Sequence, residues 1–243
     1  MEFKSKKTLK KGFTIIEVSL FLALTGLITV ALISGVSSNI NSKRYTDSVQ
    51  DFAEYLRNMY SAATYTRANN GASSNDAVYG KLLVFGTGTG EEQQQQVISY
   101  DIIGKANIDL GTEQKSDFKK ALQDAGLKVS GSGSVYSTKW QARIQTADSS
   151  AQPFTGSILI ARSPSDNAIH TLYNTSNAFT PQIQLNDGWK IPDNATRVIN
   201  FCIDSDDLGI GAKRRNVRID SDIHNGSGIQ LISSEGEEGG NAC

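Results

Sequence analysis

The sequence is poor in the residues from which metal and cofactor sites are commonly built. Among its 243 residues there are only two histidines, His170 and His224, and two cysteines. Neither histidine has a cysteine or a second histidine at metal-ligand spacing, so we expect no metal and no cofactor. The glycine-rich stretch 86–90 lacks the lysine and the helix start that a phosphate-binding loop uses. We expect no enzyme, although counting residues does not exclude a Ser-His-Asp site, which is defined by geometry.

An excess of positive charge is also absent. The formal net charge is −1, and the first twelve residues contribute five lysines against one glutamate, which leaves about −5 for the rest of the chain. Nucleic acid attracts proteins mainly through basic surfaces. The charge balance therefore argues against nucleic acid as a partner.

One long apolar run is present, over residues 13–36. As a helix, its 24 residues would reach about 36 Å, and a hydrocarbon core is roughly 30 Å thick. Five lysines precede the run, whereas only Lys43 and Arg44 follow closely, so the positive-inside rule keeps the N-terminus in the cytoplasm. We expect the bulk of the chain to be exported.

A single charged residue, Glu17, lies inside this run and separates three interpretations. A cleaved secretory signal usually has an apolar region of about 7–15 residues, shorter than the run here. A plain membrane anchor fits the length but does not explain a carboxylate, which costs about 2.5–3.5 kcal/mol at the centre of an inserted helix and less towards its end. The third interpretation gives Glu17 a function.

That third interpretation comes from a family resemblance. The stretch Lys10-Lys11-Gly12-Phe13, with Glu17 five positions after the glycine, resembles the type IV prepilin family of pilins, minor pilins and type II secretion pseudopilins. The resemblance covers roughly the first 65 residues. It implies cleavage by a prepilin peptidase after Gly12 and N-methylation of the new terminus at Phe13. It also implies that Glu17 faces the terminal amine of a neighbouring subunit, a pairing that offsets the desolvation of both charges.

The resemblance also sets the expected partners and location. The precursor would cross the bacterial cytoplasmic membrane once, meet the peptidase and assembly-platform proteins there, and join copies of itself or other pilins in an extracellular or periplasmic filament. A glycine like Gly26 is usual in the family. The proline often found eight residues later is replaced here by Ser34, so the resemblance does not extend to loosening of the helix at that proline.

The helix is expected to continue beyond the membrane to about residue 66. Its apolar positions recur at spacings of four and three, as on one face of an amphipathic helix: Tyr45, Val49, Phe52, Leu56, Met59 and Ala63. We interpret this face as packing on the protein's own core. The expected divisions are a cleaved leader (1–12), a transmembrane and filament-core segment (13–36), an amphipathic continuation (37–68) and a β-rich extracellular domain (69–243).

The remainder predicts antiparallel β-structure with one short helix. The helix is expected over 113–126, ending at Gly126, and residues 86–96 are expected to form an exposed hairpin loop. The predicted strands cover 78–85, 97–103, 134–145, 157–162, 168–173, 197–203, 217–220 and 229–232. The predicted class is α+β, with the long helix packed on an antiparallel sheet or small sandwich. The segments 200–202 and 214–218 weakly resemble H-type pseudopilins and minor pilins.

Two features of the C-terminal part leave alternatives open. Cys202 and Cys243 would both be exported, where disulfides persist, so we predict a bond between them, with two free thiols as the alternative. Oxygen ligands suited to calcium occur at Asp204, Asp206 and Asp207, with Asp220 and Asp222 later in the chain. Their spacing is not that of an EF-hand, and a solvated turn is the favoured interpretation.

Two functions follow from these patterns. The first is a structural filament subunit of the pilus or pseudopilus kind. The second is a membrane-anchored extracellular binding domain, such as an adhesin or receptor ectodomain, that does not polymerise. Cleavage between Gly12 and Phe13 distinguishes them.

Overall fold

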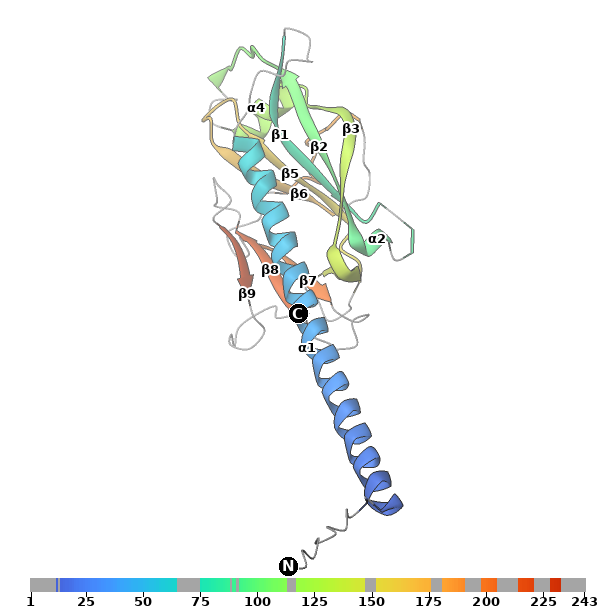
Figure 1. The fold of residues 1–243 in the computed structure, drawn as a ribbon. Helices are drawn as coiled ribbons and strands as arrows, with labels where there is room; N and C mark the ends of the chain where they lie inside the picture. Colours follow the sequence, from blue (N-terminus) through green and yellow to red (C-terminus); the bar gives the residue numbers. More distant parts are fainter. Residues whose placement is uncertain are drawn as a thin grey trace, which may run out of the picture.

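A computed structural model describes residues 12, 14–64, 75–87, 89–90, 92–112, 117–146, 152–175, 181–190, 198–204, 214–220 and 228–232. It confirms the predicted α+β class. One long helix, α1 (Ile15–Thr64), packs with its second half against antiparallel sheets, while its first half projects away from them (Figure 1). Phe13, Tyr65 and Thr66, which complete the predicted helix, lie outside the described residues.

The strands form two antiparallel sheets. The five-stranded sheet has the order β3-β2-β1-β5-β6 and consists of β3 (Lys128–Ser137), β2 (Gln96–Lys105), β1 (Asp76–Phe85), β5 (Gly156–Arg162) and β6 (Ile169–Asn174). The four-stranded sheet has the order β4-β7-β8-β9 and consists of β4 (Arg143–Thr146), β7 (Val198–Asp204), β8 (Arg214–Asp220) and β9 (Ile229–Ile232). Shorter helical elements are α2 (Glu92–Gln95), α4 (Phe118–Asp124) and the 3₁₀ turn η1 (Lys139–Gln141).

The second half of α1 packs against both sheets. Phe52 meets Phe201 of the four-stranded sheet edge to face at 5.5 Å, and Phe201 stacks on Phe85 of the five-stranded sheet at 5.3 Å. Five residues of the predicted stripe are buried: Tyr45, Val49, Phe52, Leu56 and Ala63. Ser48, Ala53 and Tyr60, which the prediction did not include, are buried as well. Met59, which the predicted stripe included, is only partly buried, and the neighbouring Tyr60 is buried in its place.

The other face of the five-stranded sheet is covered by α4 and residues 181–190. Leu122 of α4 and Trp189 pack there against Leu159 and Leu172. Because helices or loops cover both faces, β5 is buried along nearly its whole length, which explains its continuous apolar run. Of the helix predicted at 113–126, residues 118–124 form α4, which begins after the Asp117 cap, and Gly126 follows it with a φ of 62°. Residues 113–116 lie outside the described residues.

The single strand predicted over 134–145 is wrong. The chain forms β3 up to Ser137, turns through η1, and continues as β4 in the other sheet. Trp140 and Gln141 both have left-handed φ values, 57° and 59°, at a cost of about 1–3 kcal/mol each. Sequence alternation cannot distinguish one strand from two that a tight turn sends to different sheets. The expected loop at 86–96 also differs, because residues 92–95 form α2.

Candidate functional site: the projecting half of the long helix

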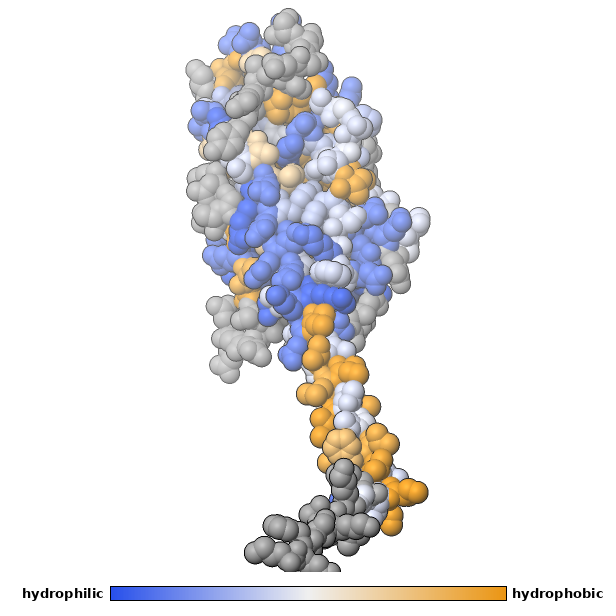
Figure 2. Space-filling model, in the orientation of Figure 1, coloured by the Kyte–Doolittle hydropathy of each residue, from blue (hydrophilic) through white to orange (hydrophobic). Residues whose placement is uncertain are grey.

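The first half of α1 is apolar all round and exposed all round. Its large side chains are between 46% and 86% exposed, and they are Ile15, Ile16, Val18, Leu20, Phe21, Leu22, Leu24, Leu27, Ile28, Val30, Leu32, Ile33, Val36 and Ile40. Figure 2 shows this segment as a hydrophobic stem below a largely hydrophilic domain. It is long and apolar enough to span a membrane. So large an exposed apolar surface needs a membrane or other apolar helices around it.

Polar side chains within this segment bond to the helix's own backbone. The Thr25 hydroxyl donates to the Phe21 carbonyl at 2.5 Å, and the Thr29 hydroxyl donates to the Thr25 carbonyl at 2.8 Å. Asn39 Nδ2 likewise donates to the Gly35 carbonyl at 3.0 Å. Hydrogen bonds of this kind remain available when water is removed. These three side chains therefore fit an apolar environment.

Thr14 caps the helix, a role that the sequence interpretation missed. Its hydroxyl accepts a hydrogen bond from the Glu17 N–H at 3.3 Å, and its carbonyl accepts from the Val18 N–H at 3.2 Å. Thr14 and Glu17 have the spacing of a capping box, in which a glutamate three residues after the cap supports the first turn. That spacing was the available signal. Glu17 thus has a local structural reason for its place besides any role in assembly.

Gly12 and Glu17, two of the predicted processing and assembly residues, lie at the end of this stem away from the domain. Gly12 is exposed, Phe13 lies outside the described residues, and Glu17 is exposed in the first turn of α1. Within the described part of the chain, Glu17 forms no ion pair. The carboxylate is therefore open to a partner outside that part.

The stem also contains two glycines with open space beside them. A Cβ added at Gly26 or Gly35 would meet nothing within 4 Å outside its own helix. No contact with the described part of the domain therefore requires a glycine at these places, although glycine costs about 1 kcal/mol in a helix interior relative to alanine.

Polar contacts join the stem's continuation to the sheets. The Tyr45 hydroxyl donates to the Ile203 carbonyl at 2.8 Å, and the Tyr60 hydroxyl lies 2.6 Å from the Thr171 hydroxyl. Burial raises the pKa of both tyrosines above the ordinary value. Together with the apolar core, these bonds fix the direction in which the stem leaves the domain.

The two predicted features of the C-terminal part are only partly described. Cys202 is buried and disulfide-bonded, whereas Cys243 lies outside the described residues. Asp204 is buried at the end of β7, and Asp206 and Asp207 lie outside the described residues. Within the described ranges, no group of three acidic, histidine or cysteine residues is placed to hold a metal.

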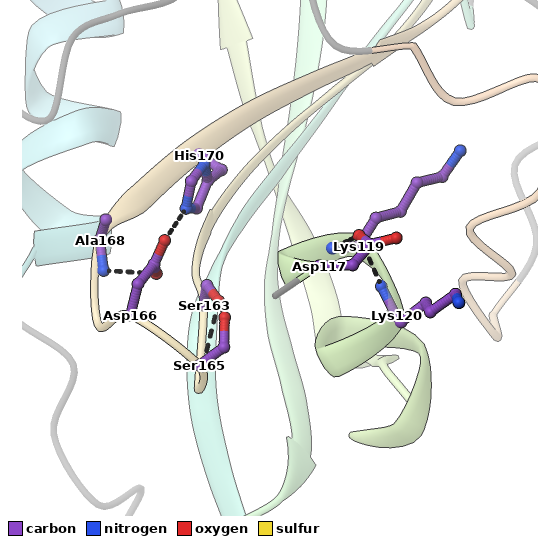
Figure 3. Close-up of polar contacts among 8 residues, drawn as sticks. All are labelled: Asp117, Lys119, Lys120, Ser163, Ser165, Asp166, Ala168 and His170. Atoms are coloured by element: carbon purple, nitrogen blue, oxygen red, sulfur yellow. Dashed lines mark hydrogen bonds and ion pairs between the residues drawn. The ribbon is translucent and has the colours of Figure 1, made fainter. Parts of the chain in front are cut away.

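The one described histidine lies in a polar cluster at the β5–β6 turn (Figure 3). His170 Nε2 is 2.9 Å from Asp166 Oδ2, and the Ala168 N–H donates to Asp166 Oδ1 at 3.0 Å. Desolvation opposes ionisation of Asp166, but the bonds from Ala168 and His170 outweigh it and lower the pKa of the carboxyl.

The geometry of this cluster is that of a turn and differs from that of a catalytic triad. Ser163 Oγ is 2.7 Å from Ser165 Oγ and accepts the Ser165 N–H at 3.1 Å. The histidine ring stacks flat on Phe118 of α4, with centroids 3.8 Å apart. In a triad the histidine stands between the serine and the aspartate, whereas here the aspartate lies within the turn and the serines bond to each other. The cluster ties the turn together and holds it against α4.

Comparison of the chain with protein-family models, with curated proteins and with solved structures finds no match. What the fold and the site define is a β-rich domain carried on one apolar helix of membrane-spanning length.

Proposed function

We propose that this protein is a structural subunit of a type IV pilus or of a type II secretion-like pseudopilus. In this proposal a prepilin peptidase cleaves after Gly12, Phe13 becomes the N-methylated terminus, and the apolar half of α1 packs with its counterparts in the filament core. The protein acts by assembly and catalyses no reaction. Its partners are copies of itself or other pilins, together with the peptidase and the assembly platform.

The observation that carries the proposal is the exposed stem with one carboxylate at its free end. An anchor alone requires only the apolar surface. A carboxylate in the first turn adds a charge that a terminal amine of a neighbouring subunit can neutralise when water is excluded. The open faces at Gly26 and Gly35 would let other helices approach the backbone closely.

Before assembly, the same stem would hold the precursor in the bacterial cytoplasmic membrane. After assembly, the domain would lie on the outside of an extracellular or periplasmic filament. The fixed junction between α1 and the sheets supports this arrangement, because a rigid connection repeats the domain's orientation from one subunit to the next.

The proposal is tested by the N-terminus of the mature protein. We expect mass spectrometry and N-terminal sequencing to find a chain that starts at methylated Phe13. Gly12→Val should remain full-length, whereas the matched change Ser5→Val, within the same leader, should be processed normally. A mature protein that keeps residues 1–12 would instead indicate the second function, an anchored extracellular domain that does not polymerise.

A further inference from the structure

An exposed aromatic-basic cluster lies where the stem enters the domain. Trp140 is 47% exposed, whereas the chain's other tryptophan, Trp189, is 8% exposed. The guanidinium carbon of Arg44 lies 4.7 Å from the centre of the Trp140 ring, and Lys43 precedes Arg44 on α1. Figure 2 shows hydrophilic residues gathered at this end of the domain, directly next to the hydrophobic stem.

The position of Trp140 is fixed relative to the helix. The Ser48 hydroxyl of α1 donates to the Lys139 carbonyl at 2.7 Å, and the Lys139 ammonium pairs with Asp51. The Thr138 N–H donates to the Gln95 carbonyl at 2.8 Å, which secures η1 from the other side. Trp140 therefore keeps its left-handed φ of 57° at a constant height along α1.

That height lies just outside the headgroup layer of a bilayer crossed by the stem. Residues 18–42 carry no charge. A hydrocarbon core of about 30 Å takes up roughly 20 helical residues, so it would extend from residue 18 to about residue 38. Arg44 follows about 9 Å further along the axis, close to the headgroup layer of roughly 5–7 Å, and long side chains can extend back towards that layer.

We propose that Trp140, Arg44 and Lys43 hold the domain against the lipid headgroups of the outer leaflet. Tryptophan is enriched at the membrane–water interface because its ring is apolar and its N–H is polar. Arg44 and Lys43 supply donors for lipid phosphates.

The order of charges along α1 supports this orientation. Lys43 and Arg44 lie nearest the membrane, while the acidic residues Asp47, Asp51 and Glu54 follow on the side away from it, and Asp51 is paired with Lys139. This contact with the headgroups requires the membrane-inserted precursor, so the inference rests on the proposed function. The contact would be lost when the subunit leaves the bilayer for the filament.

Tryptophan fluorescence of the full chain in lipid nanodiscs tests this contact with the headgroups. Trp189→Phe leaves Trp140 as the only tryptophan, and the matched variant Trp140→Phe leaves Trp189. Phosphatidylcholine–phosphatidylglycerol discs are prepared with bromine either near the headgroups or at the acyl-chain ends. We expect headgroup-proximal bromine to quench the Trp140 emission, chain-end bromine to quench it less, and neither to change the Trp189 emission.

Further comparisons keep the outcome decisive. The difference between the natural chain and Trp140→Phe gives the Trp140 signal without any change at buried Trp189. Replacing Lys43 and Arg44 together with glutamine should reduce the quenching. Emission of Trp140 that is quenched no more than that of Trp189, in chains that remain with the discs, would overturn the inference and leave the proposed function standing.

Two other outcomes would also reject the proposed contact with the headgroups. If the Trp140 emission shifts to the blue only when a disc holds several chains, and bromine does not quench it, a second copy of the chain covers the cluster. If the chain does not remain with the discs, both the contact with the headgroups and the membrane insertion of the precursor in the proposed function are rejected. Cleavage after Gly12 is measured independently of either result.

Discussion

Glu17 has two separable reasons for its place. As the third residue after the Thr14 cap, it supports the first turn of α1 by position. As the only charge in the apolar stem, it is also the group that assembly could neutralise. The first role accepts glutamine as well as glutamate, whereas the second needs a negative charge.

Replacing Glu17 therefore separates these roles. We expect Glu17→Gln and Glu17→Leu both to insert in the membrane and to be cleaved after Gly12, but to be lost from filaments, because neither side chain can neutralise a terminal amine. Filaments sheared from cells and probed for the protein provide the measurement. Glu92→Gln, an exposed change in α2, is the matched control, and normal incorporation of Glu17→Gln would show that the carboxylate acts only in the first turn.

At the scale of elements, α1 is one helix in two environments. Its first half has no packed face, while its second half supplies the centre of the domain core. The change follows from composition, because apolar residues surround the first half and form a single stripe on the second. The packed half should carry the stability of the domain, and the projecting half should carry assembly.

A cavity in the packed half tests this division. Phe52 is fully buried between Phe201 and Tyr136, so Phe52→Ala should lower the free energy of unfolding by about 3–5 kcal/mol. Urea denaturation of the detergent-solubilised chain, followed by near-ultraviolet circular dichroism, measures the change. Asn58→Ala, on the exposed side of the same helix, should alter the midpoint little, and equal effects of the two changes would contradict the assigned packing.

Pattern arguments succeeded where a segment has one environment along its length, as the packed second half of α1 and the buried strand β5 do. The buried stripe of α1 and the apolar run of β5 could be read from the sequence for that reason. They failed at 134–145, where the chain passes from β3 to β4 and thus from one sheet to the other. The left-handed residues of the intervening turn, Trp140 and Gln141, carry no sequence signal, since neither is glycine or asparagine.

At the scale of the whole molecule, the disulfide of Cys202 bears on stability. With the predicted partner Cys243 it closes a loop of about 40 residues, which stabilises a domain by roughly 4 kcal/mol on the chain-entropy model. Cys202→Ser should therefore lower the melting temperature, and reductant should lower that of the natural chain but not that of the variant. Two free thiols in exported protein, found by non-reducing mass spectrometry, would contradict the pairing.

The tyrosines between α1 and the sheets make the stability of the domain depend on pH in the alkaline range. Burial raises the pKa of Tyr45, Tyr60 and Tyr136, and the Asp51 carboxylate raises that of Tyr136 further. In the unfolded chain tyrosine ionises near pH 10, so the contribution of the neutral side chains is complete below about pH 10 and is lost as the pH rises further.

Denaturation midpoints measured from about pH 8 to 12 should therefore stay level and then fall. Each fully protected tyrosine contributes a slope of up to about 1.4 kcal/mol per pH unit above its unfolded pKa. Tyr60→Phe removes one such group and should make the fall less steep, even though loss of the bond to Thr171 lowers the starting stability. An unchanged slope would show that Tyr60 ionises without unfolding.

The sequence by itself determined the membrane-length stem, the single charge at its start and the class of the domain. These features depend on composition and on periodicity within one segment, and both are local. Only the tertiary structure decided that α1 packs where two sheets meet, that η1 sends the chain from one sheet to the other, and that Trp140 lies against Arg44. Each of these depends on contacts between residues far apart in the chain, which no local pattern encodes. Cleavage within Lys10-Lys11-Gly12-Phe13 remains a prediction from sequence, and determining the N-terminus of the mature protein tests it.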